Sequence, residues 1–176
     1  FASLVLKVFL YLDEPHFKQI VMRKLVTILI LALGLLACQP EGQIYNEHKE
    51  LSPGLEWLKK DVREFKVPID DNSVSYNVSL SFRYLSSFQP HVVKVKVTEI
   101  DPDGNEIVEE YDLKVRDEGG DYIGEFAYEI WDSKHLIVPG KNYSKPGLYT
   151  YLVEHNMDTD PLKNAMEIGM IVEKVK

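Results

Sequence analysis

Cysteine is almost absent from this sequence, because Cys38 is the only one in 176 residues. A single thiol cannot close a disulfide within the chain, and it cannot supply the several thiolates of a cysteine zinc site. A chain of this length can bury a hydrophobic core large enough to fold without such covalent or metal staples.

Long hydrophobic runs are also missing. The apolar run Leu25–Ala37 is shorter than the ~20 residues that a bilayer-spanning helix needs. It follows Met22 and a basic pair, Arg23-Lys24, which is the order of an export signal. We therefore interpret 22–37 as a signal peptide.

The signal ends in a lipobox, since the tripeptide Leu-Leu-Ala at 35–37 directly precedes Cys38. A thiol at the membrane surface can accept a diacylglyceryl group, and cleavage then frees the amine of the same residue. We predict that Cys38 is the lipid-bearing N-terminus of the mature chain, held in the membrane by several acyl chains. The alternative is a signal-like helix that contains a cysteine by chance.

The segment 1–21 precedes the first methionine, and its apolar stretch Phe1–Leu12 is broken at 13–15 by Asp-Glu-Pro before it reaches membrane length. We expect it to be an upstream translation artefact. A genuine N-terminal extension is the alternative.

Basic charge is scarce. The segment 1–37 holds four basic and two acidic residues, which leaves 16 basic and 26 acidic residues, a formal charge of −10, for the rest. Phosphate binding needs a basic surface, so this balance argues against a nucleic-acid partner. It argues equally against electrostatic docking on anionic lipid, so the predicted membrane contact is the lipid on Cys38.

Catalytic motifs are missing too. The sequence has no Gly-x-Ser-x-Gly elbow and no phosphate-binding glycine loop. Glu109 and Glu110 are adjacent, so on a strand they face opposite ways and cannot flank one glycosidic bond. In the acidic segment 101–105 the glycine falls fourth rather than sixth, which favours a hairpin turn over a calcium loop.

His155, Asp158 and Asp160 are the one group that could bind zinc or move protons. No second histidine lies at metal-ligand spacing, so a strand-end histidine capping a turn is the preferred interpretation. We predict no enzyme activity, no cofactor and no metal.

What the sequence does contain is alternation with a period of two, the pattern of strands with one buried face. The clearest case runs from Val74 to Tyr84, with apolar and aromatic residues at every second position. Similar segments are 93–98, 107–115 and 122–130, with further strands expected at Phe65–Ile69, Gly147–His155 and Ile168–Val175. About seven or eight short strands predict an all-β antiparallel β-sandwich of jelly-roll or immunoglobulin-like type.

A domain boundary and one helical turn complete this prediction. The polar segment after the lipidation site is interpreted as a lipidated tether at 38–56, which leaves the sandwich domain at 57–176. A short helical turn is expected at 162–165, with Asp160 as N-cap and Pro161 at the first helical position.

Aromatic residues of the later half are the remaining candidates for function. We single out a possible interaction surface made of Trp131, Tyr143, Tyr149, Tyr151 and His155. Tyr149 and Tyr151 share one strand face, opposite Leu148 and Leu152. The alternative is that both faces are covered by neighbouring sheets.

The segment Tyr143–Thr150, followed by Glu-His-Asn-Met at 154–157, Asp-Pro-Leu at 160–162 and Ile-Gly-Met at 168–170, resembles the C-terminal signature of the gliding motility lipoprotein GldH family. A lipobox, Trp57, a strand ending at Arg83 and a Pro-Asp-Gly hairpin at 102–104 fit the same resemblance. The segment at 85–90 departs from the asparagine-rich stretch that many members carry.

The resemblance implies an accessory lipoprotein of the gliding motility and type IX secretion apparatus, which acts through contacts with other envelope proteins. It also implies an anchor in the outer membrane. We expect the periplasmic face rather than the cell surface. A glycan- or peptide-binding envelope lipoprotein is the second hypothesis, and a hydrolase with a deep acidic pocket is the third.

Overall fold

The alternating segments form strands in the computed structural model, which describes residue 23 and residues 42–175. Cys38, the segment 1–21 and all of the predicted signal peptide except Arg23 lie outside the described residues. The strands are β1 (Gln43–Glu50), β2 (Glu56–Trp57), β3 (Arg63–Ile69), β4 (Tyr76–Leu85), β5 (Val92–Ile100), β6 (Glu106–Lys114), β7 (Glu125–Ala127), β8 (Ile130–Lys141), β9 (Gly147–His155), β10 (Leu162–Lys163) and β11 (Ala165–Lys174). No helix in the described part of the chain is long and apolar enough to cross a membrane.

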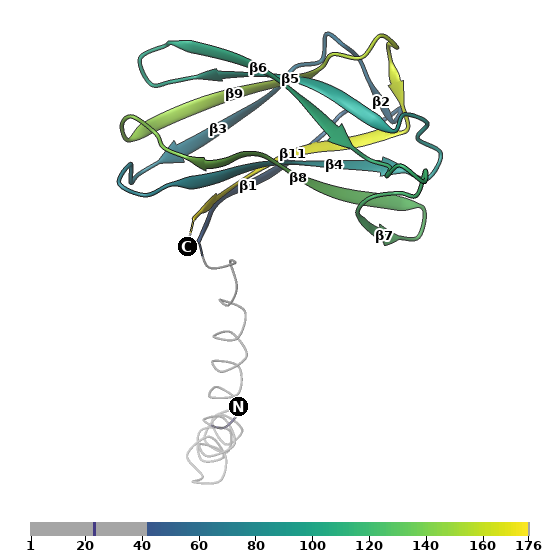
Figure 1. Ribbon diagram of the computed structural model, residues 1–176, viewed down its shortest axis with the longest axis horizontal. Helices are drawn as coiled ribbons and strands as arrows, with labels where there is room; N and C mark the ends of the chain where they lie inside the picture. The colour runs from purple at the N-terminus through teal and green to yellow at the C-terminus, as the bar shows by residue number, and fades with distance from the viewer. Residues whose placement is uncertain (1–22, 24–41, 176) are drawn as a thin grey trace, which may run out of the picture. The chain divides into compact units, whose positions relative to one another are not determined.

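Two antiparallel sheets face each other (Figure 1). The five-stranded sheet has the order β1-β11-β4-β8-β7, and the four-stranded sheet has the order β3-β9-β5-β6. A small third sheet pairs β10 with β2. The all-β antiparallel sandwich predicted from the sequence is confirmed.

The core lies between the sheets and follows the predicted alternation. On β4, every second side chain from Tyr76 to Tyr84 is at most 1% exposed. On the facing sheet all four strands contribute buried side chains, among them Phe65, Val95, Leu113 and Val153. Successive strand residues point to opposite faces, so one inward row from each strand fills the space between the sheets.

The hairpin predicted at 101–105 joins β5 to β6. The N–H of Asp101 donates to the carbonyl of Asn105 at 3.0 Å. Gly104 has a φ of 86°, a left-handed conformation that glycine adopts without steric cost.

The folded domain starts earlier than the sequence suggested. β1 pairs with β11 from Gln43↔Glu173 to Glu50↔Glu167, and Leu51 just after it is 2% exposed. The boundary placed at Trp57 is therefore too late, and the residues from 43 onward belong to the sandwich instead of a tether. β1 carries polar residues because it is an edge strand, paired only with β11, so it lacks the apolar alternation on which the prediction relied.

Two local predictions are also wrong. The segment 122–130 contains the three-residue β7 and only the first residue of β8, the long strand that the alternation did not reveal. The segment after Pro161 is no helical turn, because Leu162 pairs with Trp57 to form the β10–β2 ladder. In both places strand pairing overrides the local pattern, with the next strand β8 for β7 and with the distant β2 for β10.

Candidate functional site

Three of the proposed interaction residues belong to the core. Tyr143, Tyr149 and Tyr151 are 3%, 2% and 2% exposed. The Tyr143 and Tyr151 hydroxyls share a hydrogen bond of 2.7 Å, and the rings of Tyr143 and Tyr149 lie 4.5 Å apart. Burial raises the pKa of both Tyr143 and Tyr151. The shared face of Tyr149 and Tyr151 points inward, so the surface proposed on these rings is wrong for all three.

His155 is buried as well, with 1% of its surface exposed. Its ring packs edge-on against Trp57 at 5.3 Å, and its Nδ1 accepts a long 3.4 Å hydrogen bond from the N–H of Met157. This contact matches a histidine that caps a turn at the end of its strand. Nε2 lies 3.7 Å from Asp160 Oδ1, too far for a hydrogen bond.

Desolvation lowers the pKa of His155, which favours the neutral ring at pH 7. Asp160 approaches this ring, but the grouping with Asp158 that the sequence suggested is not assembled. Among the described residues, no three His, Cys, Asp or Glu side chains gather where they could hold one metal ion.

Trp131 is the only one of the five that reaches toward the surface. Its ring stacks on Tyr122 at 4.8 Å and lies 4.7 Å from Phe126, and its Nε1 donates to Ser86 Oγ at 3.0 Å. Phe126 is 57% exposed, and Tyr128, in the turn between β7 and β8, is 94% exposed. We call Ile123, Phe126, Tyr128 and Trp131 the aromatic hairpin patch.

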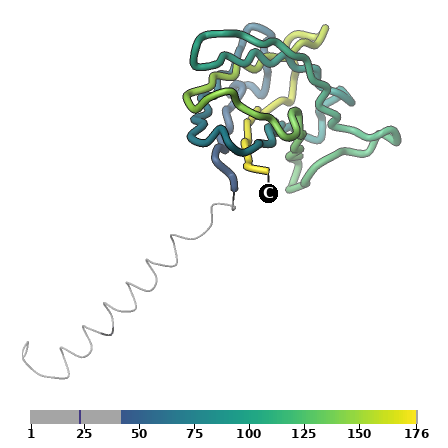
Figure 2. Tube along the Cα trace, turned by 60° about the vertical axis from the view of Figure 1, so that its left-hand side comes forward, coloured from purple at the N-terminus to yellow at the C-terminus, as the bar shows by residue number. Residues whose placement is uncertain are grey.

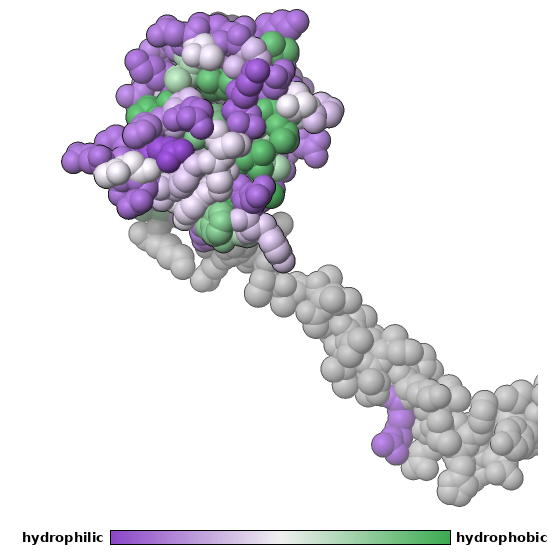
Figure 3. All heavy atoms as spheres, turned by 90° about the vertical axis from the view of Figure 1, so that its right-hand side faces the viewer, coloured by the Kyte–Doolittle hydropathy of each residue, from purple (hydrophilic) through white to green (hydrophobic). Residues whose placement is uncertain are grey.

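All of this patch except Trp131, which is on β8, belongs to the β6–β8 connection, which extends to one side of the sheets (Figure 2). Figure 3 shows that the end of the sandwich carrying β7 exposes apolar side chains between hydrophilic ones. Sequence reasoning placed Phe126 and Tyr128 on a half-buried strand and so missed their exposure. A turn at Tyr128-Glu129 would have indicated this exposure. Neither residue type is common in turns, so the sequence carries no clear signal for it.

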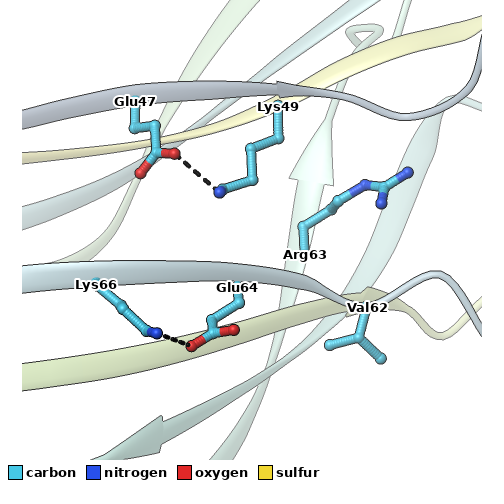
Figure 4. A pocket seen from close by; sticks show the side chains of 6 residues that line it. All are labelled: Glu47, Lys49, Val62, Arg63, Glu64 and Lys66. Carbon is cyan, nitrogen blue, oxygen red and sulfur yellow. Dashed lines mark ion pairs between the residues drawn. The ribbon is translucent and has the colours of Figure 1, made fainter.

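One open side of the sandwich, between β1 and β3, is a shallow charged groove (Figure 4). Its ion pairs join neighbours on the same strand, Glu47 with Lys49 at 2.8 Å and Glu64 with Lys66 at 3.1 Å. Arg63 donates to the carbonyl of Leu51. Both carboxylates of the groove are thus paired with a lysine of their own strand.

The opposite open side, between β6 and β8, has an ion pair that joins the two sheets. Lys141 Nζ lies 2.7 Å from Glu99 Oε2, and their side chains are only 19% and 14% exposed. Ile107, Tyr111 and Ile137 line the crevice around this pair. The pair lies next to the buried tyrosines, and the charge of Glu99 contributes to the raised pKa of Tyr151 after desolvation.

The outer face of the five-stranded sheet carries a charge network across three strands. Arg83 on β4 binds Asp132 on β8 through two hydrogen bonds of 2.7 and 3.1 Å, and Glu167 on β11 through two of 3.0 Å. These bonds raise the pKa of Arg83 further above its ordinary value. Nearby, Ser81 Oγ lies 3.2 Å from His48 Nδ1. The described residues bring no carboxylate to His48, so no Ser-His-Asp arrangement forms there.

The comparison with known families decides which group this sandwich belongs to. The model of the family described as GldH lipoprotein matches residues 43–172. The chain belongs to the GldH lipoprotein family. The match begins at the first residue of β1 and ends inside β11, so it covers the sandwich described above. GldH lipoproteins are gliding motility lipoproteins and are not known as enzymes.

Other comparisons add little to the GldH assignment. No curated protein matches the chain. Among solved structures, a family GH115 4-O-methyl-α-glucuronidase is 14% identical with a TM-score of 0.36, over 80% of this chain and 19% of that one. A family 16 carbohydrate-binding module is 10% identical with a TM-score of 0.24, over 69% of this chain and 72% of that one. The chain thus spans about a fifth of the glucuronidase, and likenesses this distant carry no argument about what it binds.

Proposed function

We propose that this GldH-family chain is a lipid-anchored envelope component of the gliding motility and type IX secretion apparatus, and that it acts through protein–protein contacts. The observation that carries the proposal is the family match over residues 43–172, close behind a lipobox that ends at Cys38.

The early start of β1 has a consequence for the anchor. Only residues 39–42 separate Cys38 from Gln43, and five fully extended residues span at most about 18 Å. With lipid on Cys38, the end of the sandwich at which β1 begins is held next to the bilayer. The outer membrane, on its periplasmic side, is the location we favour.

The aromatic hairpin patch is the exposed surface best suited to a protein partner. Large aromatic side chains supply much of the binding energy in interfaces. Tyr128 is almost fully exposed, and Phe126 has more than half of its surface exposed. The patch replaces the surface first proposed, of which it keeps only Trp131. Capture of a glycan or peptide on Tyr143, Tyr149 and Tyr151 loses its support because these rings are buried.

A clean deletion in the native host tests the proposal. Colony spreading and the profile of secreted proteins are scored side by side, with the wild-type gene restored in a matched strain. We expect the deletion to reduce one or both readouts and the restored gene to recover them. Normal spreading together with normal secretion would contradict the proposed role.

A further inference from the structure

The four-stranded sheet ends in an open strand, β6, which forms its outer margin (Figure 1). β6 is nine residues long and pairs with β5 in one unbroken register from Val92↔Lys114 to Ile100↔Glu106. It contains neither proline nor glycine. An edge strand this regular exposes a row of unpaired backbone groups that can template another strand.

The other edges of the sandwich are protected. β3 contains Pro68, which cannot donate a backbone hydrogen bond, and β7 has only three residues. β1 has a register shift at Gln43/Tyr45. The part of β8 beyond β7 has register shifts near Val138 and contains Pro139. Such bulges and prolines block edge-to-edge pairing with any strand. β6 has neither and relies on charged side chains, which disfavour only strands of like charge.

Backbone hydrogen bonds at both ends of the β5–β6 pair show which groups of β6 are free. Asp101 N–H donates to the Asn105 carbonyl at 3.0 Å, and Val115 N–H donates to the His91 carbonyl at 2.9 Å. Hydrogen-bonded residues alternate in an antiparallel pair, so the odd-numbered residues of β6 bond to β5. The N–H and C=O groups of Glu106, Val108, Glu110 and Asp112 therefore point to the open edge.

Side chains of β6 indicate what kind of strand fits there. Ile107 and Val108, near the start of β6, are 56% and 55% exposed and place one apolar side chain on each face of the edge. Four acidic residues accompany them, namely Glu106, Glu109, Glu110 and Asp112, against the single base Lys114. None of these four carboxylates forms a salt bridge within the described residues, and Lys96, opposite Glu110, pairs with Glu154 instead.

From this we infer that the β6 edge binds an extended, lysine- or arginine-bearing segment of a protein partner by strand addition, with apolar partner residues next to Ile107 and Val108. A second copy of this chain is a poorer occupant, because pairing two β6 strands sets like charges against each other. The backbone bonds supply affinity, and the flanking carboxylates select a basic partner. This inference rests on the proposed function, since it names the surface through which the protein contacts would be made.

The test uses the full chain in detergent micelles and three nonapeptide probes. The first alternates valine with lysine, the second alternates valine with glutamate, and the third combines glycine with lysine at the charge of the first. Amide hydrogen exchange is followed by NMR at Val108, Glu110 and Asp112. We expect the valine–lysine peptide alone to slow exchange at these amides about tenfold or more, and binding to weaken as salt is raised.

Two variants at one position check the backbone role. Val108→Pro removes a donor that points away from β5, so the hairpin keeps its ladder, while Val108→Thr keeps the N–H and the branched shape. We expect Val108→Pro to weaken binding of the valine–lysine peptide about tenfold, and Val108→Thr to stay within about threefold of the wild type. Circular dichroism of both variants establishes that they fold.

Three results would overturn the inference: equal protection by the glycine–lysine peptide, unchanged binding by a folded Val108→Pro, or concentration-dependent protection without any peptide, which would make a second copy the occupant. The purified chain is tested without reference to motility. If no peptide binds the β6 edge, the deletion phenotype still tests the role in motility. If the deletion strain spreads normally, the peptide experiment still tests the β6 edge.

Discussion

Replacing Tyr151 tests whether the proposed aromatic surface is really core. The ring is 2% exposed between the sheets, and its hydroxyl bonds to that of Tyr143 at 2.7 Å. Tyr151→Ala removes a buried ring, so we expect a loss of about 3–5 kcal/mol in the free energy of unfolding. Tyr151→Phe keeps the ring but leaves the Tyr143 hydroxyl without this partner, for which we expect about 1–2 kcal/mol.

Urea unfolding followed by tryptophan fluorescence measures both losses. Leu148 is the matched control, because it lies on the same strand and is 51% exposed. Leu148→Ala should change the free energy of unfolding by no more than about 0.5 kcal/mol. The reasoning is refuted if Tyr151→Ala is as mild as the Leu148 control, because a ring on the surface would behave in that way.

Two further predictions concern the backbone and pH. Gly124 has a φ of 133°, and an added Cβ would lie 2.8 Å from the carbonyl carbon of Asp132, whereas Gly140 has a φ of 61° and nothing within 4 Å. Gly124→Ala should therefore cost more than about 2 kcal/mol and Gly140→Ala only about 1 kcal/mol, and equal urea midpoints for the two variants would contradict this. Burial lowers the pKa of His155 in the folded state, so the unfolded chain binds more protons as pH falls below about 6.5. The contribution of neutral His155 to the free energy of unfolding should be fully present above that pH and fall on acidification by at most about 1.4 kcal/mol per pH unit. Urea titrations between pH 7.5 and 5 measure this slope. A slope that His155→Gln leaves unchanged would count against the prediction.

The alternation of side chains was enough to predict the sandwich and several strand boundaries. Gly147–His155 was predicted residue for residue, and the row Tyr76–Tyr84 faces the core as its period requires. β1 escaped prediction because an edge strand with one neighbour needs little apolar surface. β8 escaped because Ser133 and His135, both on its inward row, break the apolar pattern. His135 Nε2 and Ser133 Oγ form a hydrogen bond of 2.9 Å, and Ser133 Oγ also donates to the carbonyl of Phe82.

The candidate site was harder to predict than the fold. The strand period says that Tyr149 and Tyr151 share a face, but it cannot say which face another sheet will cover. The exposure of Phe126 and Tyr128 depends on β7 being short, which only the pairing with β8 determines. The open edge at β6 likewise follows from the strand order, a property of the whole topology rather than of any one segment.

Complementation of the deletion strain by Cys38→Ala, with colony spreading as the readout, tests the central claim most directly. The variant alters the predicted lipidation site and leaves the sandwich, which starts at Gln43, untouched. We predict that the wild-type gene restores spreading and that Cys38→Ala, expressed at the same level, does not and lacks fatty-acid label. Full spreading with an unlabelled Cys38→Ala protein would contradict a lipid-anchored role in motility.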